Sequence, residues 1–61
     1  MKQARILVVD DEPLARTRLR KLIEAMDDYI VVGEAQDGLQ AIRMVATDNI
    51  DIIFNAVVNS F

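Results

Sequence analysis

The stretch from Arg5 to Pro13, RILVVDDEP, consists of a short apolar run followed by three acidic residues, 10–12, which we call the acidic corner. Residues 6–9 are all apolar and mostly β-branched, without the alternation of polar and apolar residues that marks a half-exposed strand. A continuous run of this kind is typical of a strand that is buried on both faces of a parallel sheet. Pro13 suits the first turn of a helix, where its missing N–H costs nothing. The stretch therefore predicts a buried strand, an acidic turn and the start of a helix.

A helix and a second strand are expected next. Apolar residues recur at steps of mostly three and four from Pro13 to about Met26, which predicts a helix with one inward stripe. YIVVGEA, residues 29–35, predicts the strand, and Gly33 within it indicates a bulge or a close approach of backbone. The expected inward stripe of the helix consists of Leu14, Ala15, Leu19, Leu22, Ile23 and Met26.

A second helix and a third strand complete the pattern. Asp37 is expected to cap a helix that runs from Gly38 to about Thr47. Its inward face is expected to carry Leu39, Ile42, Val45 and Ala46. IDIIFNAVV, residues 50–58, is again mostly continuous and apolar and predicts a strand.

The alternation of strands and helices predicts the fold class. We expect a three-layer α/β domain, βαβαβ, with parallel strands, right-handed crossovers and helices on both faces of the sheet, over residues 1–61 as a single domain. In open sheets of this type, ligands bind beyond the carboxyl ends of the strands. Asp10 and Asp11 are expected at such an end, and Ala56 near the corresponding end of the third strand.

Length and composition point to self-association. A chain of 61 residues hides only about 60% of the surface that its unfolded form exposes. A hydrophobic fraction of 52% argues against disorder and leaves more apolar surface than a small monomer easily covers. Without Cys, no disulfide can help, and without His only carboxylate-type metal sites remain. We therefore expect the fold to be stabilised by a partner subunit rather than by a disulfide or a metal ion.

Charge and motifs disfavour several classes of function. A net charge of −3 gives no general attraction to nucleic acid or anionic lipid. The apolar runs are far short of the ~20 residues that span a bilayer, and the N-terminus does not resemble a signal peptide, so a cytoplasmic location is expected. No G-x-G-x-x-G follows the first strand. Without His or Cys no nucleophile–base pair is available, and we expect no enzyme.

One basic cluster leaves two interpretations open. Arg16, Arg18, Arg20 and Lys21 form either the solvated face of a helix, which is the commoner case, or a phosphate-binding patch.

The sequences RILVVDDEPLARTRLRKLIEAM, residues 5–26, and VVGEAQDGLQAI, residues 31–42, resemble the first half of a receiver domain of two-component response regulators. The segment DDEPLARTRL, residues 10–19, is most similar to the corresponding segment of receivers that precede a LytTR-type DNA-binding domain. The resemblance covers roughly residues 4–54 and implies a CheY-like, flavodoxin-like fold. It also implies that the three strands lie in the order 2-1-3.

The resemblance also implies a site. In the family the acidic pair binds Mg2+, and an Asp at the end of the third strand takes a phosphoryl group from a histidine kinase. Asp10 and Asp11 match the acidic pair, whereas Ala56 occupies the phosphoacceptor position and Asn55 replaces a Leu. We therefore expect no catalytic residue, a weak, vestigial Mg2+ site at Asp10 and Asp11, no required cofactor, and a histidine kinase as partner only in the parent family.

The neighbours of Ala56 offer no substitute acceptor. Asn55 carries an amide, which does not take a phosphoryl group, and Asp51 lies about 16 Å upstream along an extended strand. In the family order the third strand is central, but here it is expected at the edge, where open N–H and C=O groups recruit other strands. We expect a homodimer through this strand, with element swapping as a variant. The expected interface residues are Ile52, Ile53, Phe54, Val57, Val58 and Phe61; for Phe61 a frayed terminus is the alternative.

Three functional hypotheses follow. The first is a truncated, phosphorylation-incompetent receiver fragment that folds by self-association and has no activity of its own. The second is a segment of a two-component response regulator, in signal transduction and transcription regulation, that retains weak Mg2+ binding at the acidic pair. The third, a DNA-binding module, is disfavoured by the negative charge.

Overall fold

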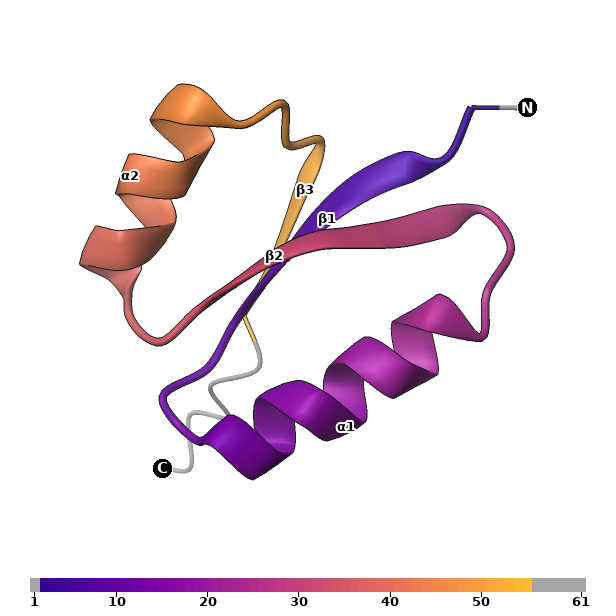
Figure 1. The fold of residues 1–61 in the computed structure, drawn as a ribbon, viewed down its shortest axis with the longest axis horizontal. Helices are drawn as coiled ribbons and strands as arrows, with labels where there is room; N and C mark the ends of the chain where they lie inside the picture. The colour runs from indigo at the N-terminus through magenta and orange to yellow at the C-terminus, as the bar shows by residue number, and fades with distance from the viewer. Residues whose placement is uncertain (1, 56–61) are drawn as a thin grey trace.

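The computed structural model describes residues 2–55, which form a parallel sheet between two helices (Figure 1). The elements are β1 (Ala4–Val9), α1 (Pro13–Glu24), β2 (Tyr29–Ala35), α2 (Gly38–Thr47) and β3 (Ile52–Asn55). The strand order is β2-β1-β3, and β1 pairs in parallel with both neighbours. The expected three-layer α/β arrangement and the 2-1-3 order are confirmed.

The core is built on both faces of β1. Residues 6–9 are at most 4% exposed, as their continuous apolar run predicted. Leu7 and Val9 pack beneath α2, whereas Ile6 and Val8 pack beneath α1. The cluster on the α2 side adds Ala35, Ala41, Met44 and Ile50, and the cluster on the α1 side adds Leu19, Ile23, Tyr29 and Val31.

The inward stripe of α1 is narrower than the sequence predicted, and the predicted inward face of α2 is wrong because all four of its residues are exposed. α1 buries Ile23 and packs Leu19 against the sheet, and α2 buries Ala41 and packs Met44. Both helices lie over β1 and β2 rather than over β3, so their outer apolar residues have no strand beneath them. The predicted inward residues that are instead exposed are Leu14, Leu22 and Met26 on or just after α1, and Leu39, Ile42 and Val45 on α2, with exposed fractions between 42% and 70%. Ala46 on α2, also predicted inward, is exposed as well.

The start of α2 and the bulge in β2 follow the sequence signals. The Asp37 carboxylate accepts a hydrogen bond from the Gln40 N–H at 2.8 Å, which confirms the N-cap. Ile6 pairs with Val31 and Leu7 with Gly33, so Val32 is an extra residue in β2. A Cβ at Gly33 would overlap the Met44 methyl group, so this position is a close approach as well as part of a bulge.

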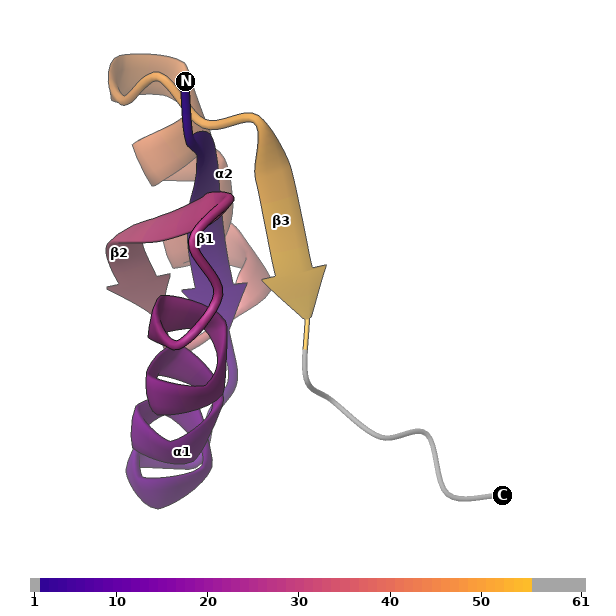
Figure 2. The same ribbon diagram turned by 90° about the vertical axis from the view of Figure 1, so that its right-hand side faces the viewer.

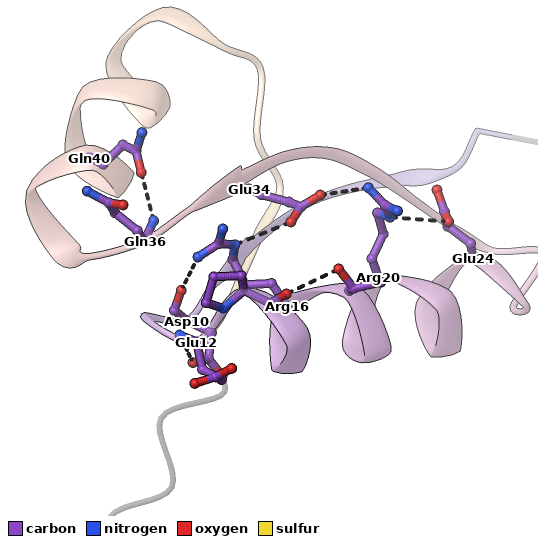
Figure 3. A network of polar contacts seen from close by, with 10 residues as sticks. Asp10, Glu12, Arg16, Arg20, Glu24, Glu34, Gln36 and Gln40 are labelled. Carbon is purple, nitrogen blue, oxygen red and sulfur yellow. Dashed lines mark hydrogen bonds and ion pairs between the residues drawn. The ribbon is translucent and has the colours of Figure 1, made fainter.

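Ion pairs fasten α1 to the sheet (Figure 3). The Glu34 carboxylate on β2 lies 3.3 Å from the Nε of Arg16 and 2.8 Å from a terminal nitrogen of Arg20. Arg20 also lies 3.8 Å from the more exposed Glu24. Half of the basic cluster is thus engaged with one carboxylate, whereas Arg18 is exposed.

Replacing Glu34 tests how much this anchor contributes. We expect Glu34→Gln to lower the free energy of unfolding by about 1–2 kcal/mol, because it leaves two partly buried guanidinium groups without their carboxylate. The matched control is Glu24→Gln, whose longer and more exposed pair should cost no more than about 0.5 kcal/mol. Urea unfolding followed by circular dichroism measures both, and equal losses would contradict the assignment.

Candidate functional site

The acidic corner begins where β1 ends. Asp10 is 6% exposed and is the only buried charged residue in the described part of the chain. Its Oδ1 accepts a hydrogen bond from the Glu12 N–H at 2.9 Å, and its own N–H donates to the Ala35 carbonyl at 3.0 Å. Its carbonyl accepts from a terminal nitrogen of Arg16 at 2.8 Å (Figure 3). The turn from β1 to α1 is therefore held through both the main chain and the side chain of Asp10.

The two members of the acidic pair lie in different environments. Asp11 is exposed, unlike its buried neighbour Asp10. Glu12, also exposed, takes the N-cap position of α1 but makes no capping hydrogen bond with its side chain. The Asp10 carboxylate instead satisfies the Glu12 N–H, so this carboxylate organises the start of the helix.

The carboxyl end of β3 lies beside this corner. Val9, the residue before Asp10, pairs with Asn55 at the end of β3. The parallel register thus brings the ends of these strands to one edge of the sheet, where open α/β sheets bind ligands. Ala56, at the expected acceptor position, lies outside the described residues.

Within residues 2–55, the acidic corner offers at most two carboxylates, those of Asp10 and Asp11, as ligands for Mg2+. Within residues 2–55, no three acidic, His or Cys side chains gather in a way that could hold a metal ion. Mg2+ in proteins is often held by one or two carboxylates with several waters. Asp10 and Asp11 are the residues that could supply them, with one oxygen of Asp10 already accepting the Glu12 N–H.

Asp51 lies at the opposite end of the sheet from this corner, as expected for a residue at the entry to β3. Its Oδ2 accepts from the Arg5 N–H at 2.8 Å, and its N–H donates to the Arg5 carbonyl at 2.8 Å. The Arg5 side chain also donates to the Asn49 carbonyl. The sequence analysis did not predict these hydrogen bonds between Asp51 and Arg5, nor the ion pair between Glu34 and Arg16. Spacing along the chain does not show which side chains of different elements come into contact.

β3 is open to solvent, and Figure 2 shows it at one side of the sheet. All of its residues are exposed; Ile52, Ile53 and Phe54 are 40%, 51% and 44% exposed. These three are the described members of the expected interface, and the structure brings them together on one edge. Val57, Val58 and Phe61, also expected there, lie outside the described residues.

An apolar groove flanks β3 on each face of the sheet. The groove on the α2 side has a volume of about 360 Å³ and the groove on the α1 side about 350 Å³. The first is lined mainly by Val9, Ala41, Ile42, Val45 and Ile53, and the second by Ile6, Ile23, Met26, Tyr29, Ile52 and Phe54. β3 thus separates two hollows that the helices leave uncovered. In the described part of the chain, neither helix has the length and apolar character needed to cross a membrane.

Comparison with known proteins identifies the family. The response regulator receiver domain matches residues 6–57. The transcriptional regulatory protein BtsR of Salmonella typhi is 44% identical over 50 residues, which are 82% of this chain and 21% of BtsR. The nitrate/nitrite response regulator protein NarL of Escherichia coli K12 is 42% identical over 50 residues, 82% of this chain and 23% of NarL.

A third relative has a different printed activity. A protein-glutamate methylesterase/protein-glutamine glutaminase of Pseudoalteromonas atlantica is 45% identical over 49 residues, 80% of this chain but only 13% of that protein. The chain spans about one fifth of the length of the regulators it matches, and no solved structure gives a significant match. Because the receiver model covers most of the chain and response regulators share more than 40% of the aligned residues, this chain belongs to the response regulator receiver domain family of two-component systems.

Proposed function

We propose that the 61-residue chain is a phosphorylation-incompetent receiver segment that associates with a second copy of itself through β3 and has no enzymatic activity. The observation that carries this proposal is the exposure of the whole of β3 between two apolar grooves. An apolar edge strand with open main-chain groups recruits another strand.

The sequence at the acceptor position supports the lack of phosphotransfer. The receiver pattern calls for an Asp where this chain has Ala56, and a methyl group is no nucleophile. Asp10, which directly follows β1, accepts the Glu12 N–H, and Asp51, which directly precedes β3, is bound to Arg5 at the far end of the sheet. The methylesterase relative does not argue for catalysis here, because the match covers so little of that protein.

Treatment with acetyl phosphate and Mg2+ tests this incompetence. We expect the intact mass of the chain to stay unchanged, because no acceptor carboxylate occupies position 56. A receiver that has its acceptor Asp, treated in parallel, shows that the reagent is active. Phosphoryl mass on this chain would overturn the proposal.

Mg2+ binding at Asp10 and Asp11 is the part of the second hypothesis that the site supports. We expect a dissociation constant weaker than about 1 mM, because only two carboxylates are offered and one oxygen is already engaged. Titration calorimetry of the unmodified chain, of Asp10→Asn and of the exposed control Asp27→Asn measures this. Tight binding that only Asp10→Asn removes would show that the pair is a working metal site.

The two edges of the sheet differ in how open they are to pairing. β2 carries a bulge at Val32 and the charged Glu34, two features that blunt an edge against further pairing. β3 pairs with β1 without a register shift and carries no charged residue between Ile52 and Asn55. β3 is therefore the edge that favours a partner strand. With two-fold symmetry the contact is isologous and the central pair antiparallel, which gives a six-stranded sheet.

Light scattering across a dilution series, with circular dichroism on each sample, tests the association. We expect twice the 6.9 kDa mass of one chain, and a loss of secondary structure on dilution because folding is linked to assembly. Ile53→Lys, in β3, should abolish the dimer, whereas the matched control Ile30→Lys, in β2, should leave it intact. A folded monomer that persists on dilution would contradict self-association.

We propose further that the parent regulator is a cytoplasmic transcription regulator of the LytTR type that receives its signal from a histidine kinase. The segment DDEPLARTRL, residues 10–19, supports the LytTR type. The names of the relatives, transcriptional regulatory protein BtsR and nitrate/nitrite response regulator protein NarL, support a regulatory role for the parent protein. Sequencing the parent gene tests this: a different class of DNA-binding domain after the receiver would contradict it.

A further inference from the structure

We propose that Arg16 is a positioning residue for the acidic corner, which sets the relative placement of the Asp10 and Asp11 carboxylates and so decides how strongly the corner binds Mg2+. This inference rests on the weak Mg2+ site proposed above and adds to it a residue that is not itself a ligand. It follows from three observations: the main-chain group that Arg16 holds, the way in which Glu34 holds Arg16, and the contrast with Arg20.

Arg16 is bonded to the peptide that joins the two acidic residues. One of its terminal nitrogens, Nη1, donates to the Asp10 carbonyl at 2.8 Å (Figure 3). That carbonyl belongs to the same planar peptide unit as the Asp11 N–H, so the bond restrains how the plane is turned. The Cα atoms of both residues lie in this plane, and each carries one of the carboxylate side chains. The orientation of one peptide therefore sets the relative placement of both carboxylates.

The remaining bonds of Asp10 hold that residue but not its neighbour. The Asp10 N–H donates to the Ala35 carbonyl at 3.0 Å, and the Asp10 Oδ1 accepts from the Glu12 N–H at 2.9 Å. Asp11 is exposed, so packing around its side chain does not place it. The position of the Asp11 carboxylate relative to Asp10 then depends on the peptide that Arg16 holds.

Glu34 on β2 holds the Arg16 guanidinium in turn. Its Oε1 lies 3.3 Å from the Arg16 Nε, so the guanidinium reaches from β2 to the acidic corner with two different nitrogens. The Arg16 and Glu34 side chains are 20% and 29% exposed, which shields the pair partly from solvent. A guanidinium is a rigid planar fork, so a contact at Nε restrains the direction of Nη1. A Lys side chain would present one ammonium group on a flexible stem and would not hold both acceptors in this geometry.

Arg20 provides the contrast within the same helix. Its Nη1 lies 2.8 Å from the Glu34 Oε2, which is closer than Arg16 lies to Glu34, and its Nε lies 3.8 Å from Glu24. Both arginines thus tie α1 to β2. In the described part of the chain, however, Arg16 is the one that also reaches the turn after β1. A contribution to stability can therefore be separated from a contribution to the acidic corner.

Charge and positioning predict opposite effects of removing Arg16. A guanidinium beside the corner repels a cation, although Glu34 offsets part of that charge. Loss of the charge alone would therefore strengthen Mg2+ binding. Loss of the contact with the Asp10 carbonyl would weaken it, because a residue that orients metal ligands typically contributes about 10–100-fold to affinity. A weaker Mg2+ site in an Arg16 variant therefore reports positioning.

An NMR titration with Mg2+ at constant ionic strength, followed through the Asp11 amide signal, tests the inference. We expect Arg16→Lys, which keeps the charge, to raise the dissociation constant about tenfold. Arg16→Gln should raise it as well. The matched control Arg20→Lys should leave it unchanged, although this variant disturbs an ion pair with the same Glu34. Urea unfolding of each variant shows whether affinity simply follows stability.

The outcomes separate this inference from the metal site on which it rests. Unchanged or tighter binding by either Arg16 variant, or an equal loss in Arg20→Lys, would overturn the positioning role and leave the metal site standing. If Mg2+ does not shift the Asp11 amide signal of the unmodified chain, the metal site proposed above is overturned, and this inference with it.

A second readout uses the unmodified chain, in case the Arg16 variants fail to fold. Binding and positioning are linked, so Mg2+ should shift the Arg16 Nε–H signal together with the Asp11 amide signal, with the same dissociation constant. The Arg20 Nε–H signal should not move. An unmoved Arg16 signal, or equal movement of both arginine signals, would overturn the positioning role.

Discussion

Coverage of β1 is the constraint on which the rest of the structure depends. Four consecutive apolar residues, 6–9, alternate between the two faces of this strand, so each face needs a helix and each edge needs a strand. α1 and α2 supply the faces, and β2 and β3 supply the edges (Figure 1). Each other element therefore covers part of β1. Of the two edge strands, β3 is the one whose faces no helix covers, so its side chains are exposed.

The two edge strands meet this constraint in different ways. Both helices pack against β2, and the bulge at Val32 shifts its register with β1. β2 also carries Glu34, whose carboxylate forms the ion pairs with α1. β3 is clamped at its start by Asp51 and Arg5 and then runs exposed along β1. Its apolar residues face the two grooves in alternation. β3 thus combines regular pairing with β1 along one edge and exposed apolar residues on both faces.

The sequence predicted the elements more accurately than the contacts between them. The run at residues 6–9, the cap at Asp37 and the close approach at Gly33 are local signals, and the structure has all three. The predicted stripe on α1 was too wide, because periodicity does not show how broad a sheet lies beneath a helix. On α2 the predicted face was wrong: Ala41 and Met44 pack on the sheet, and the larger apolar residues of the predicted face are exposed. The partners of Glu34 and Asp51 depend on how elements dock, which spacing along the chain does not encode.

The acidic corner shows why a resemblance at a site is not by itself a function. The sequence placed Asp10 and Asp11 together, but the structure gives them unequal positions, one buried and one exposed. The Asp10 carboxylate satisfies a main-chain N–H at the start of α1, and its carbonyl receives the guanidinium of Arg16, which also contacts Glu34. Asp10 therefore has a structural task in joining β1 to α1 that needs neither a metal ion nor a phosphoryl group. A receiver segment with Ala56 can keep this task, and with it the shape of the corner.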